Sequence, residues 1–401
     1  MSLRRLLLMV TVSVSATSAA LCACATSEDA EVTPPSDTAY EVPTEDAGVD
    51  RAADVPVKPC KDCEYFPEEC TEDALCAFAP FDPRSPESPI DSRAAVLNIR
   101  GRGPNDVWLT GALGTAAHFD GVAWTMSDLG AGETQRALWL LESSELSFGS
   151  WKTFFSRGAA NETVDAGLSS DGWIVRPFPT SSFGFELNGN YVKTSWAATG
   201  SDALWVGSDT QAGCGLWRVR RTPPSTFAIA EGLPLSTCKT QGVTEVFGIH
   251  GASSDVVWAV GGRGMAVRVD RANEITPSYR VLNSLTMNTL RAVWAASDTD
   301  VWAVGSGGTI RHYGGAELAW HVVDQVPTSE TLNAVWGTSA SDIWAVGDAG
   351  VVLHYDGARW SRVKVAGFAA SPADLYTVWS PAPGHVWVGG RGVVLSLGGK
   401  P

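Results

Sequence analysis

The stretch LNAVWGTSASDIWAVGDAGVVLHYDGA, residues 332–358, decides the fold because the chain repeats it. Residues 290–316 read LRAVWAASDTDVWAVGSGGTIRHYGGA, and residues 375–399 keep the spacing in LYTVWSPAPGHVWVGGRGVVLSLGG. Self-similarity at a fixed period indicates an architecture in which each unit packs mainly against its neighbours. The sequence therefore predicts a scaffold of stacked units before any single residue is interpreted.

The period is set by the second tryptophan of each unit, which recurs every 42 to 44 residues between positions 258 and 387. The six markers are Trp108, Trp205, Trp258, Trp302, Trp344 and Trp387. The first two markers are 97 residues apart, so one degenerate unit lies between them, and residues 136–151 are the candidate for its start. We therefore expect seven units over 97–399, with six or eight as the alternatives.

Each unit is strand-like. AVW and DVWAVG are short runs rich in valine and tryptophan, and turn-forming residues separate them. GVVLHY supplies a third run, and the Asp-Gly pair at 356–357 is a strong hairpin signal that leads into a fourth. Four short strands in about 43 residues are typical of a propeller blade. The sequence predicts an all-β, seven-bladed β-propeller over 94–401.

The tryptophans of this region predict how the blades pack. All 17 tryptophans of the chain lie after residue 94. A blade is too thin to bury both of its faces alone, and an indole provides a large apolar area at each contact. We expect the repeated tryptophans to form the core between blades, and a role in stacking on a ligand is the alternative.

The last unit stops after its third strand, at 396–399. A missing fourth strand would leave an open sheet edge, which natural sheets avoid. We therefore expect the segment 60–93, which is rich in cysteine, to close the ring, with the closing strand within CAFAPFDPR, residues 76–84.

Residues 1–24 have the pattern of a bacterial lipoprotein signal. Arg4 and Arg5 precede an apolar stretch, and LCAC at 21–24 places leucine at −3 and alanine at −1 before Cys24. We predict lipidation at Cys24; a plain secretory signal is the alternative. Ala25 then follows the lipid, which favours sorting to the outer membrane, on either its periplasmic or its cell-surface side. We expect no membrane-spanning segment later in the chain.

Residues 25–59 predict a disordered, acidic, proline-rich linker. The segment holds nine acidic and two basic residues and almost no large apolar side chains, so it cannot offset its ordering entropy by burial. A coil of this length spans on the order of 35 Å. The whole chain has a formal net charge of −15, which argues against nucleic acid and anionic lipid surfaces as partners.

The cysteines agree with export. After the signal, the six that remain are Cys60, Cys63, Cys70, Cys76, Cys214 and Cys238. An even number in an exported chain predicts disulfides, with Cys214 and Cys238 paired within one blade. The first four allow three connectivities, and their spacing is loose for the alternative, a four-thiolate zinc site.

Catalytic and cofactor motifs are not evident in the sequence. We find no phosphate-binding loop, no HExxH and no GxSxG, and we expect no metal, no cofactor and no catalytic residue. His118, His312 and His354 recur at one point of the repeat, before an aromatic residue and a turn. This recurrence favours a structural role within the turn or against the neighbouring aromatic side chain.

The chain resembles exported bacterial lipoproteins with tryptophan-rich propeller repeats of the form AVWGxxxxDVWAVGxxGxIxHYDGxxW. The match is strong over 290–361, moderate over 97–124, 246–270 and 375–399, and weak over 136–240. The repeat style is also similar to the photosystem assembly factor propellers and the Asp-box superfamily. This resemblance implies the fold and an exported binding role, and it carries no catalytic residues over.

DGARWS, residues 356–361, matches the sialidase Asp box only in part. That chemistry would also need converging arginines, for which Arg263, Arg311 and Arg391 are the candidates. We therefore expect a monomeric, lipid-anchored scaffold that binds an envelope protein or glycan through its loops. The irregular stretch 136–240 is the candidate binding surface. The alternatives are a polysaccharide hydrolase or lyase with its site in the central channel, and a purely structural envelope protein.

Overall fold

The structure is a computed structural model of the whole chain, which divides into two units, Met1–Lys58 and Pro59–Pro401. The residues it describes all lie in the second unit, and the account below concerns that unit alone. They are 62–158, 169–178, 191–209, 212–222, 226–234, 236–237, 245–315, 318–368 and 372–401. The expected signal, the linker, Cys24 and Cys60 lie outside these residues.

Seven antiparallel sheets follow one another along the chain, and each has the same strand order from first to fourth. The first strands are β2 (Val96–Gly103), β6 (Ala137–Leu140), β10 (Val192–Trp196), β14 (Val246–His250), β18 (Leu290–Ser297), β22 (Leu332–Ser339) and β27 (Leu375–Ala382). The second strands are β3 (Asp106–Gly111), β7 (Glu145–Phe148), β11 (Ala203–Ser208), β15 (Val256–Gly261), β19 (Asp300–Gly305), β23 (Asp342–Gly347) and β28 (His385–Gly390).

The outer half of each sheet is built in the same way. The third strands are β4 (Ala116–Phe119), β8 (Thr153–Arg157), β12 (Leu216–Thr222), β16 (Ala266–Asp270), β20 (Thr309–Tyr313), β24 (Val352–Tyr355) and β29 (Val393–Leu397). The fourth strands are β5 (Trp124–Met126), β9 (Ile174–Pro177), β13 (Thr226–Glu231), β17 (Ser278–Val281), β21 (His321–Val322), β25 (Trp360–Arg362) and β1 (Ala74–Ala77).

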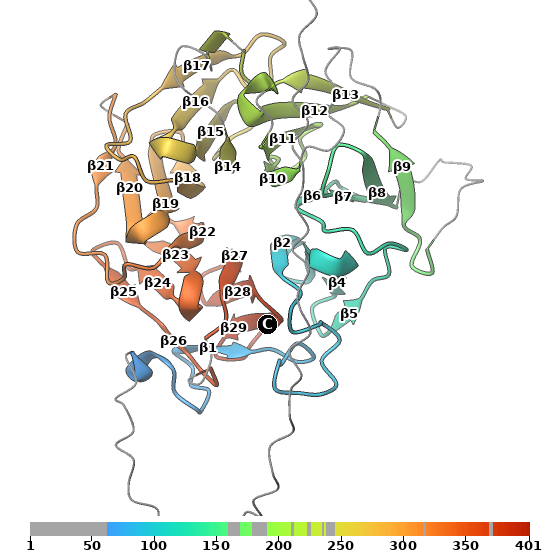
Figure 1. Cartoon of the computed structure of the whole chain (residues 1–401), viewed down its shortest axis with the longest axis vertical. Helices are drawn as coiled ribbons and strands as arrows, with labels where there is room; N and C mark the ends of the chain where they lie inside the picture. The colour runs from blue at the N-terminus through green and yellow to red at the C-terminus, as the bar shows by residue number, and fades with distance from the viewer. Residues whose placement is uncertain are drawn as a thin grey trace, which may run out of the picture. The chain divides into compact units, whose positions relative to one another are not determined.

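The seven sheets stand around a common axis, with the first strand of each nearest the centre (Figure 1). The predicted seven-bladed propeller is therefore confirmed. The hairpin expected between the paired tryptophans is present as well, because Trp294 and Trp302 are direct cross-strand partners on β18 and β19. Residues 136–151 do begin the degenerate unit, as β6 and β7.

The last blade is completed by the first strand of the chain. β1 pairs antiparallel with β29, placing Cys76 opposite Ser396, and parallel with the short β26 (Lys364–Val365) that follows blade 6. The expected segment was 76–84, whereas the strand is Ala74–Ala77. It ends early because Pro80 and Pro83 have no N–H to extend a ladder.

The closing segment is held on both sides of its strand. Cys70 and Cys76 form a disulfide, which confirms that these two cysteines are disulfide-bonded and gives a pairing that the sequence left open. Before them, the guanidinium of Arg362 lies 4.4 Å from the centroid of the Tyr65 ring and 3.0 Å from a carboxylate oxygen of Asp62. The N-terminal segment therefore joins blades 6 and 7 as well as completing blade 7.

The hydrophobic core lies between neighbouring blades. In blade 5, Trp302 is 5% exposed, and its ring centroid is 4.8 Å from that of Tyr355 and 5.7 Å from that of Trp360, both in blade 6. Trp258 of blade 4 meets Tyr313 and Trp320 of blade 5 in the same way. Burying one indole contributes on the order of 5 kcal/mol by area, so these contacts hold the ring together.

A glycine ends most second strands because the backbone that enters the same blade passes closely there. A Cβ atom at Gly305 would lie 2.0 Å from the carbonyl oxygen of Thr289, and one at Gly347 would lie 2.0 Å from that of Thr331. Any side chain would therefore collide with the backbone that leads into the first strand of the same blade. The repeated glycine of the AVG motif thus lets the connection from the preceding blade pass beside the second strand.

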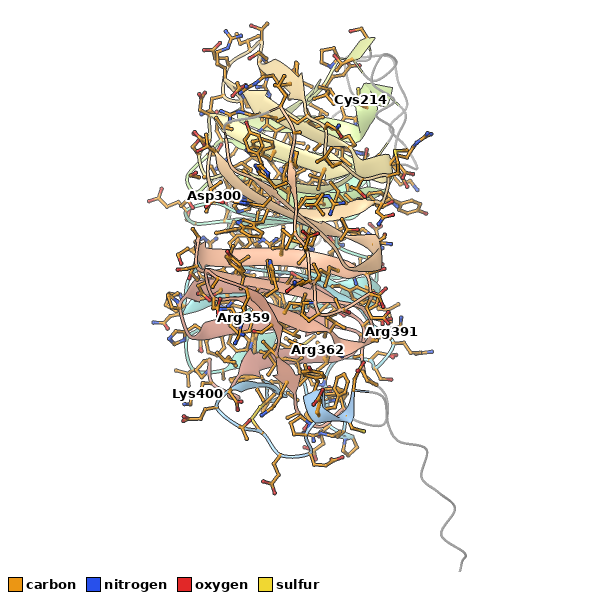
Figure 2. The ribbon with its side chains drawn as sticks, turned by 90° about the vertical axis from the view of Figure 1, so that its left-hand side faces the viewer. Cys214, Asp300, Arg359, Arg362, Arg391 and Lys400 are labelled. Carbon is orange, nitrogen blue, oxygen red and sulfur yellow. A yellow bond between two sulfur atoms is a disulfide. The ribbon has the colours of Figure 1, made fainter. Side chains whose placement is uncertain are left out.

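The disc has two faces. One carries the connections from the first to the second strand of each blade, and we call it the hairpin face; the other carries the turns between second and third strands. Figure 2 views the disc edge-on, with Asp300, at the start of β19, toward the first face and Arg391, after β28, at the second. Among the described residues, no helix is long and apolar enough to cross a membrane.

Candidate functional site

A cavity of about 630 Å³ lies on the axis of the propeller. Its lining lies in the later part of the first strands, and in blades 1, 3 and 4 it continues into the loop toward the hairpin face. The loop residues of the lining include Pro104, Thr199 and Ser254. The cavity therefore opens on the hairpin face and ends near the middle of the disc.

The floor of the cavity lies at one repeated position, which lines the cavity in every blade except blade 5. In every blade, one residue of the first strand lies directly opposite the marker position of the second strand. These seven residues, which we call the axial ring, are Arg100, Trp139, Trp196, His250, Trp294, Trp336 and Trp379. Five of the seven are tryptophan. The ring is therefore aromatic, with Arg100 and His250 as its two exceptions.

Side chains of the axial ring meet across the axis. The Arg100 guanidinium carbon lies 4.7 Å from the centroid of the Trp336 ring. The Trp336 ring stands edge-on to His250, with centroids 5.1 Å apart, and the centroid of His250 is 5.4 Å from that of Trp196. These residues come from blades 1, 6, 4 and 3, so the contacts cross the whole channel and make a floor.

Arg100 is the cation at this floor. Its Nη1 atom donates hydrogen bonds to the carbonyl oxygens of Ile99, at 2.7 Å, and Val378, at 3.5 Å. Burial lowers the pKa of the Arg100 guanidinium to about 10, so the group stays charged at neutral pH. Within the described part of the chain, no carboxylate pairs with it. The floor thus holds a positive charge without a counter-charge from the protein.

His250 is neutral in the same place. Burial, and then the positive charge of Arg100, lower the pKa of His250 to about 3. Its Nδ1 atom accepts a hydrogen bond of 3.1 Å from the backbone N–H of Ala295 in the next blade. The imidazole therefore acts as an uncharged, fixed part of the floor.

Arg102, the second cation of the cavity wall, is neutralised. Its guanidinium makes ion pairs with Asp106, at 2.7 Å, and Glu145, at 2.6 Å. Burial lowers the pKa of Arg102, but the hydrogen bonds to these two carboxylates outweigh it and raise the pKa overall. Asp and Glu are absent from the described residues that line the cavity. The site therefore offers aromatic faces, hydroxyl groups and one unpaired cation.

The repeated tryptophans predicted from the sequence lie outside this site. Each packs in a different cluster between blades and is at most 5% exposed: Trp108, Trp205, Trp258, Trp302, Trp344 and Trp387. The accessible indoles are in the axial ring, where Trp196 and Trp336 are half-buried. The sequence reasoning did not single out this ring. Its signal is the position eight residues before the marker, where LNIRG and FGIHG replace the usual tryptophan by Arg100 and His250.

The three recurring histidines have the structural role that the sequence predicts, but their partners differ from the expected ones. The Nε2 atoms of His118, His312 and His354 lie 2.9, 2.7 and 2.7 Å from an aspartate Oδ1 atom at the start of the second strand. Each imidazole also stacks on the marker tryptophan of its own blade. They bond to this aspartate rather than within the turn, and they stack on indole rather than tyrosine.

The cysteines among the described residues are all disulfide-bonded. Besides the Cys70–Cys76 pair, Cys63 and Cys214 are each disulfide-bonded. A disulfide removes the thiolates that the zinc alternative requires at Cys70 and Cys76. Cys60 and Cys238 lie outside the described residues, so the pairing of Cys214 with Cys238 stays a prediction.

The partial Asp box at 356–361 forms a hairpin turn and not a binding site. Oδ1 of Asp356 accepts backbone N–H bonds from Ala358 and Arg359, both at 2.9 Å, which holds the hairpin. The candidate arginines do not converge, because none of Arg263, Arg311 and Arg391 lines the cavity. Of the irregular stretch 136–240, residues 179–190 lie outside the described residues, while β6 and β10 contribute Trp139 and Trp196 to the cavity.

Comparisons with known proteins show the fold alone. No family model matches the chain, and no curated protein matches it. Two similar structures are described as YCF48 bound to D1 peptide and YCF48 from Cyanidioschyzon merolae, with 16% and 14% identity. Both have a TM-score of 0.56 and cover 77% of this chain, and the match spans 92% and 96% of theirs. The WD40 propeller of Doa1 is 11% identical with a TM-score of 0.53, over 75% of this chain and 91% of that one. The chain is thus a β-propeller similar to those of YCF48 and WD40 proteins.

Proposed function

We propose that this protein is a lipid-anchored scaffold of the cell envelope that binds a protein partner at the mouth of the central cavity. The wall of the cavity carries the proposal, because it places hydroxyl groups and one unpaired cation beside aromatic faces, and polar groups set beside aromatic surface are typical of binding sites. Glycoside hydrolysis, by contrast, uses a pair of carboxyl groups. The two acidic residues that contact the cavity wall through Arg102, Asp106 and Glu145, are each paired with that arginine.

Two further observations support a protein as the partner. One structural neighbour is described as bound to a peptide, and loops on a rigid frame are the usual place for recognition. The formal net charge of −15 disfavours nucleic acid. The site is therefore suited to a partner that inserts an apolar segment between Trp196 and Trp336.

The proposed lipid anchor is supported by the sequence alone. The lipobox at 21–24 and the acidic linker at 25–59 support a lipid at Cys24 and a tether on the order of 35 Å long. Such a tether gives the propeller a high local concentration near the membrane surface and leaves it free to turn.

Photocrosslinking in cells tests this proposal. A photoreactive amino acid at Thr199, an exposed residue of the cavity mouth, should give an adduct with an envelope protein, whereas one at Arg263, exposed on the other face, should not. Mass spectrometry of the adduct identifies the partner. Equal adducts from both positions would contradict the site, and an adduct carrying sugar mass would contradict the assignment to a protein.

A further inference from the structure

The axial ring departs from its own repeat at Arg100. Five blades place tryptophan there, and several of these indoles fit over a residue of the next blade. For example, the Trp379 ring packs so closely on Gly101 that a Cβ atom at this glycine would lie only 2.5 Å from the ring. Trp294 packs in the same way on Gly337. Arg100 instead turns toward the two preceding blades, to Val378 of blade 7 and Trp336 of blade 6. A charged residue has therefore replaced an apolar one at the floor of a cavity.

The hydrogen-bond capacity of Arg100 is only partly used. A guanidinium has five N–H donors in a planar fork, and Nη1 donates to two backbone carbonyls. The Nε and Nη2 atoms of Arg100 have no acceptor among the described residues. Neither atom is fully buried, so both donors face the open space of the cavity. An external acceptor in the cavity can therefore occupy the fork.

We infer that the cavity binds a carboxylate carried on an apolar body, with the Arg100 fork holding the carboxylate and the faces of Trp336 and Trp196 holding the body. This inference rests on the proposed function and names the chemistry of its site. The planar fork matches the two oxygens of a carboxylate. A cavity of about 630 Å³ holds a drug-sized molecule or the last few residues of a peptide.

Charge selects a monoanion over other ligands. The floor offers one unpaired cation, because Arg102 is already paired with two carboxylates and His250 is neutral at physiological pH. A phosphate dianion or a polyanion would bring more negative charge than the site balances, into a chain whose formal net charge is −15. An amine or other cation would be repelled by Arg100.

The closed floor restricts how a ligand enters. Contacts from Arg100 through Trp336 and His250 to Trp196 cross the channel, so a chain cannot pass through at this level. Only a small molecule or the end of a polymer reaches Arg100. The carboxylate therefore comes either from a free organic acid or from the C-terminus of a polypeptide, and the two sources share the same recognition.

The test compares acids with their amides. The purified full chain is equilibrated in dialysis with 3-phenylpropionate, with 3-phenylpropionamide, and with a defined set of tetrapeptides ending in Phe, Trp, Leu or Ile, as free acids and as C-terminal amides. At least one acid should be retained about tenfold or more over its amide. Retention of phenylpropionate alone identifies a small-molecule site, and retention of peptide acids alone identifies a chain terminus.

Variants assign the effect to Arg100. Arg100→Gln should abolish the preference for acids, and Arg100→Lys should keep part of it. Arg100→Trp places the residue of the other blades at this position, so it should stay folded, with a circular dichroism melt like that of the parent, and lose the preference. Arg291→Gln, an exposed arginine three residues before the ring position on β18, is the matched control and should keep it.

Three results would overturn the inference: equal retention of acids and amides, retention of neither, or an acid preference that survives in folded Arg100→Trp. In each case, protein adducts that persist from Thr199 would leave the proposed function standing. Loss of the Thr199 adducts together with a clear acid preference would mean that a small acid, and not a protein, occupies the cavity.

Discussion

The imidazole of His312 lies on the indole of Trp302, with ring centroids 4.2 Å apart and planes within 23° of parallel. Asp300 holds both rings, because its Oδ1 atom accepts hydrogen bonds from Trp302 Nε1, at 3.1 Å, and lies 2.7 Å from His312 Nε2. The next blade repeats the arrangement at Asp342, Trp344 and His354. One carboxylate thus orients two aromatic rings, and one of these belongs to the core between blades.

The first prediction concerns this aspartate. Asp342→Ala leaves the ring nitrogens of Trp344 and His354 and the hydroxyl of Thr338 without their acceptor. We expect the free energy of unfolding to fall by about 2–3 kcal/mol, measured by urea denaturation at pH 7. Asp324→Ala, at an exposed position, is the control and should change it by less than about 0.5 kcal/mol. Equal effects of the two substitutions would show that the carboxylate is not a structural centre.

The second prediction concerns pH and His250. The folded protein lowers the pKa of this imidazole from 6.5 to about 3, so below pH 6.5 the unfolded chain takes up a proton that the folded protein excludes. The free energy of unfolding should therefore fall by about 1.4 kcal/mol per pH unit as the pH drops toward 4. Above pH 6.5 this contribution is constant.

His250→Phe isolates this contribution, since Arg100 remains charged throughout and the carboxylates of the chain titrate in both proteins. Urea denaturation at pH 7, 5.5 and 4.5 should show that the variant loses stability less steeply than the parent. Parallel curves would mean that His250 is protonated in the folded state at these pH values.

The third prediction concerns ring closure. A chain that begins at residue 78 lacks β1, in which Ala74 and Leu75 are fully buried. It leaves an open edge on β29, and we expect its melting temperature to be lower by roughly 10 °C or more. A chain that begins at residue 62 keeps the strand and should melt like the full chain in a calorimeter. Leu75→Asp in the full chain should reproduce the loss, and if all three melt together, β1 does not close the ring.

The fourth prediction concerns the anchor. Cys24→Ser should abolish incorporation of labelled palmitate and release the protein from the membrane fraction in a bacterial host, because this thiol is the site that we propose for the lipid. Cys22→Ser is the matched control, two residues away in the same signal, and should leave both readouts unchanged. Release by the second substitution instead of the first would assign the lipid to Cys22.

The fold was predictable because its signal is local and repeated. Each marker tryptophan lies between a fixed pair of turns, and packing between blades requires the same residue at this position in most blades. The sequence therefore predicts that Trp302 and Trp344 are buried between blades. The closing strand was harder to place, because β1 lies about 300 residues from β29 in sequence. Its position depends on where Pro80 stops the ladder.

The site was less predictable, although part of its signal is in the sequence. Aligning the units on their markers shows Arg100 and His250 where the other blades have tryptophan. That both side chains lie against Trp336 depends on the geometry of the ring, because residues from blades 1, 4 and 6 meet only at the axis. The absence of a carboxylate partner for Arg100 among the described residues is likewise a property of three-dimensional packing.

The placement of β1 beside β29 couples folding to the direction of synthesis. A ribosome builds the chain from its N-terminus, so Ala74–Ala77 is the earliest strand of the propeller to emerge, and its antiparallel partner, Val393–Leu397, is the last. Blades 1 to 6 can stack in order as the chain emerges, while the seventh waits for Val393–Leu397. Until then both ends of the nascent arc expose unpaired backbone, and completion of the disc is a single late event.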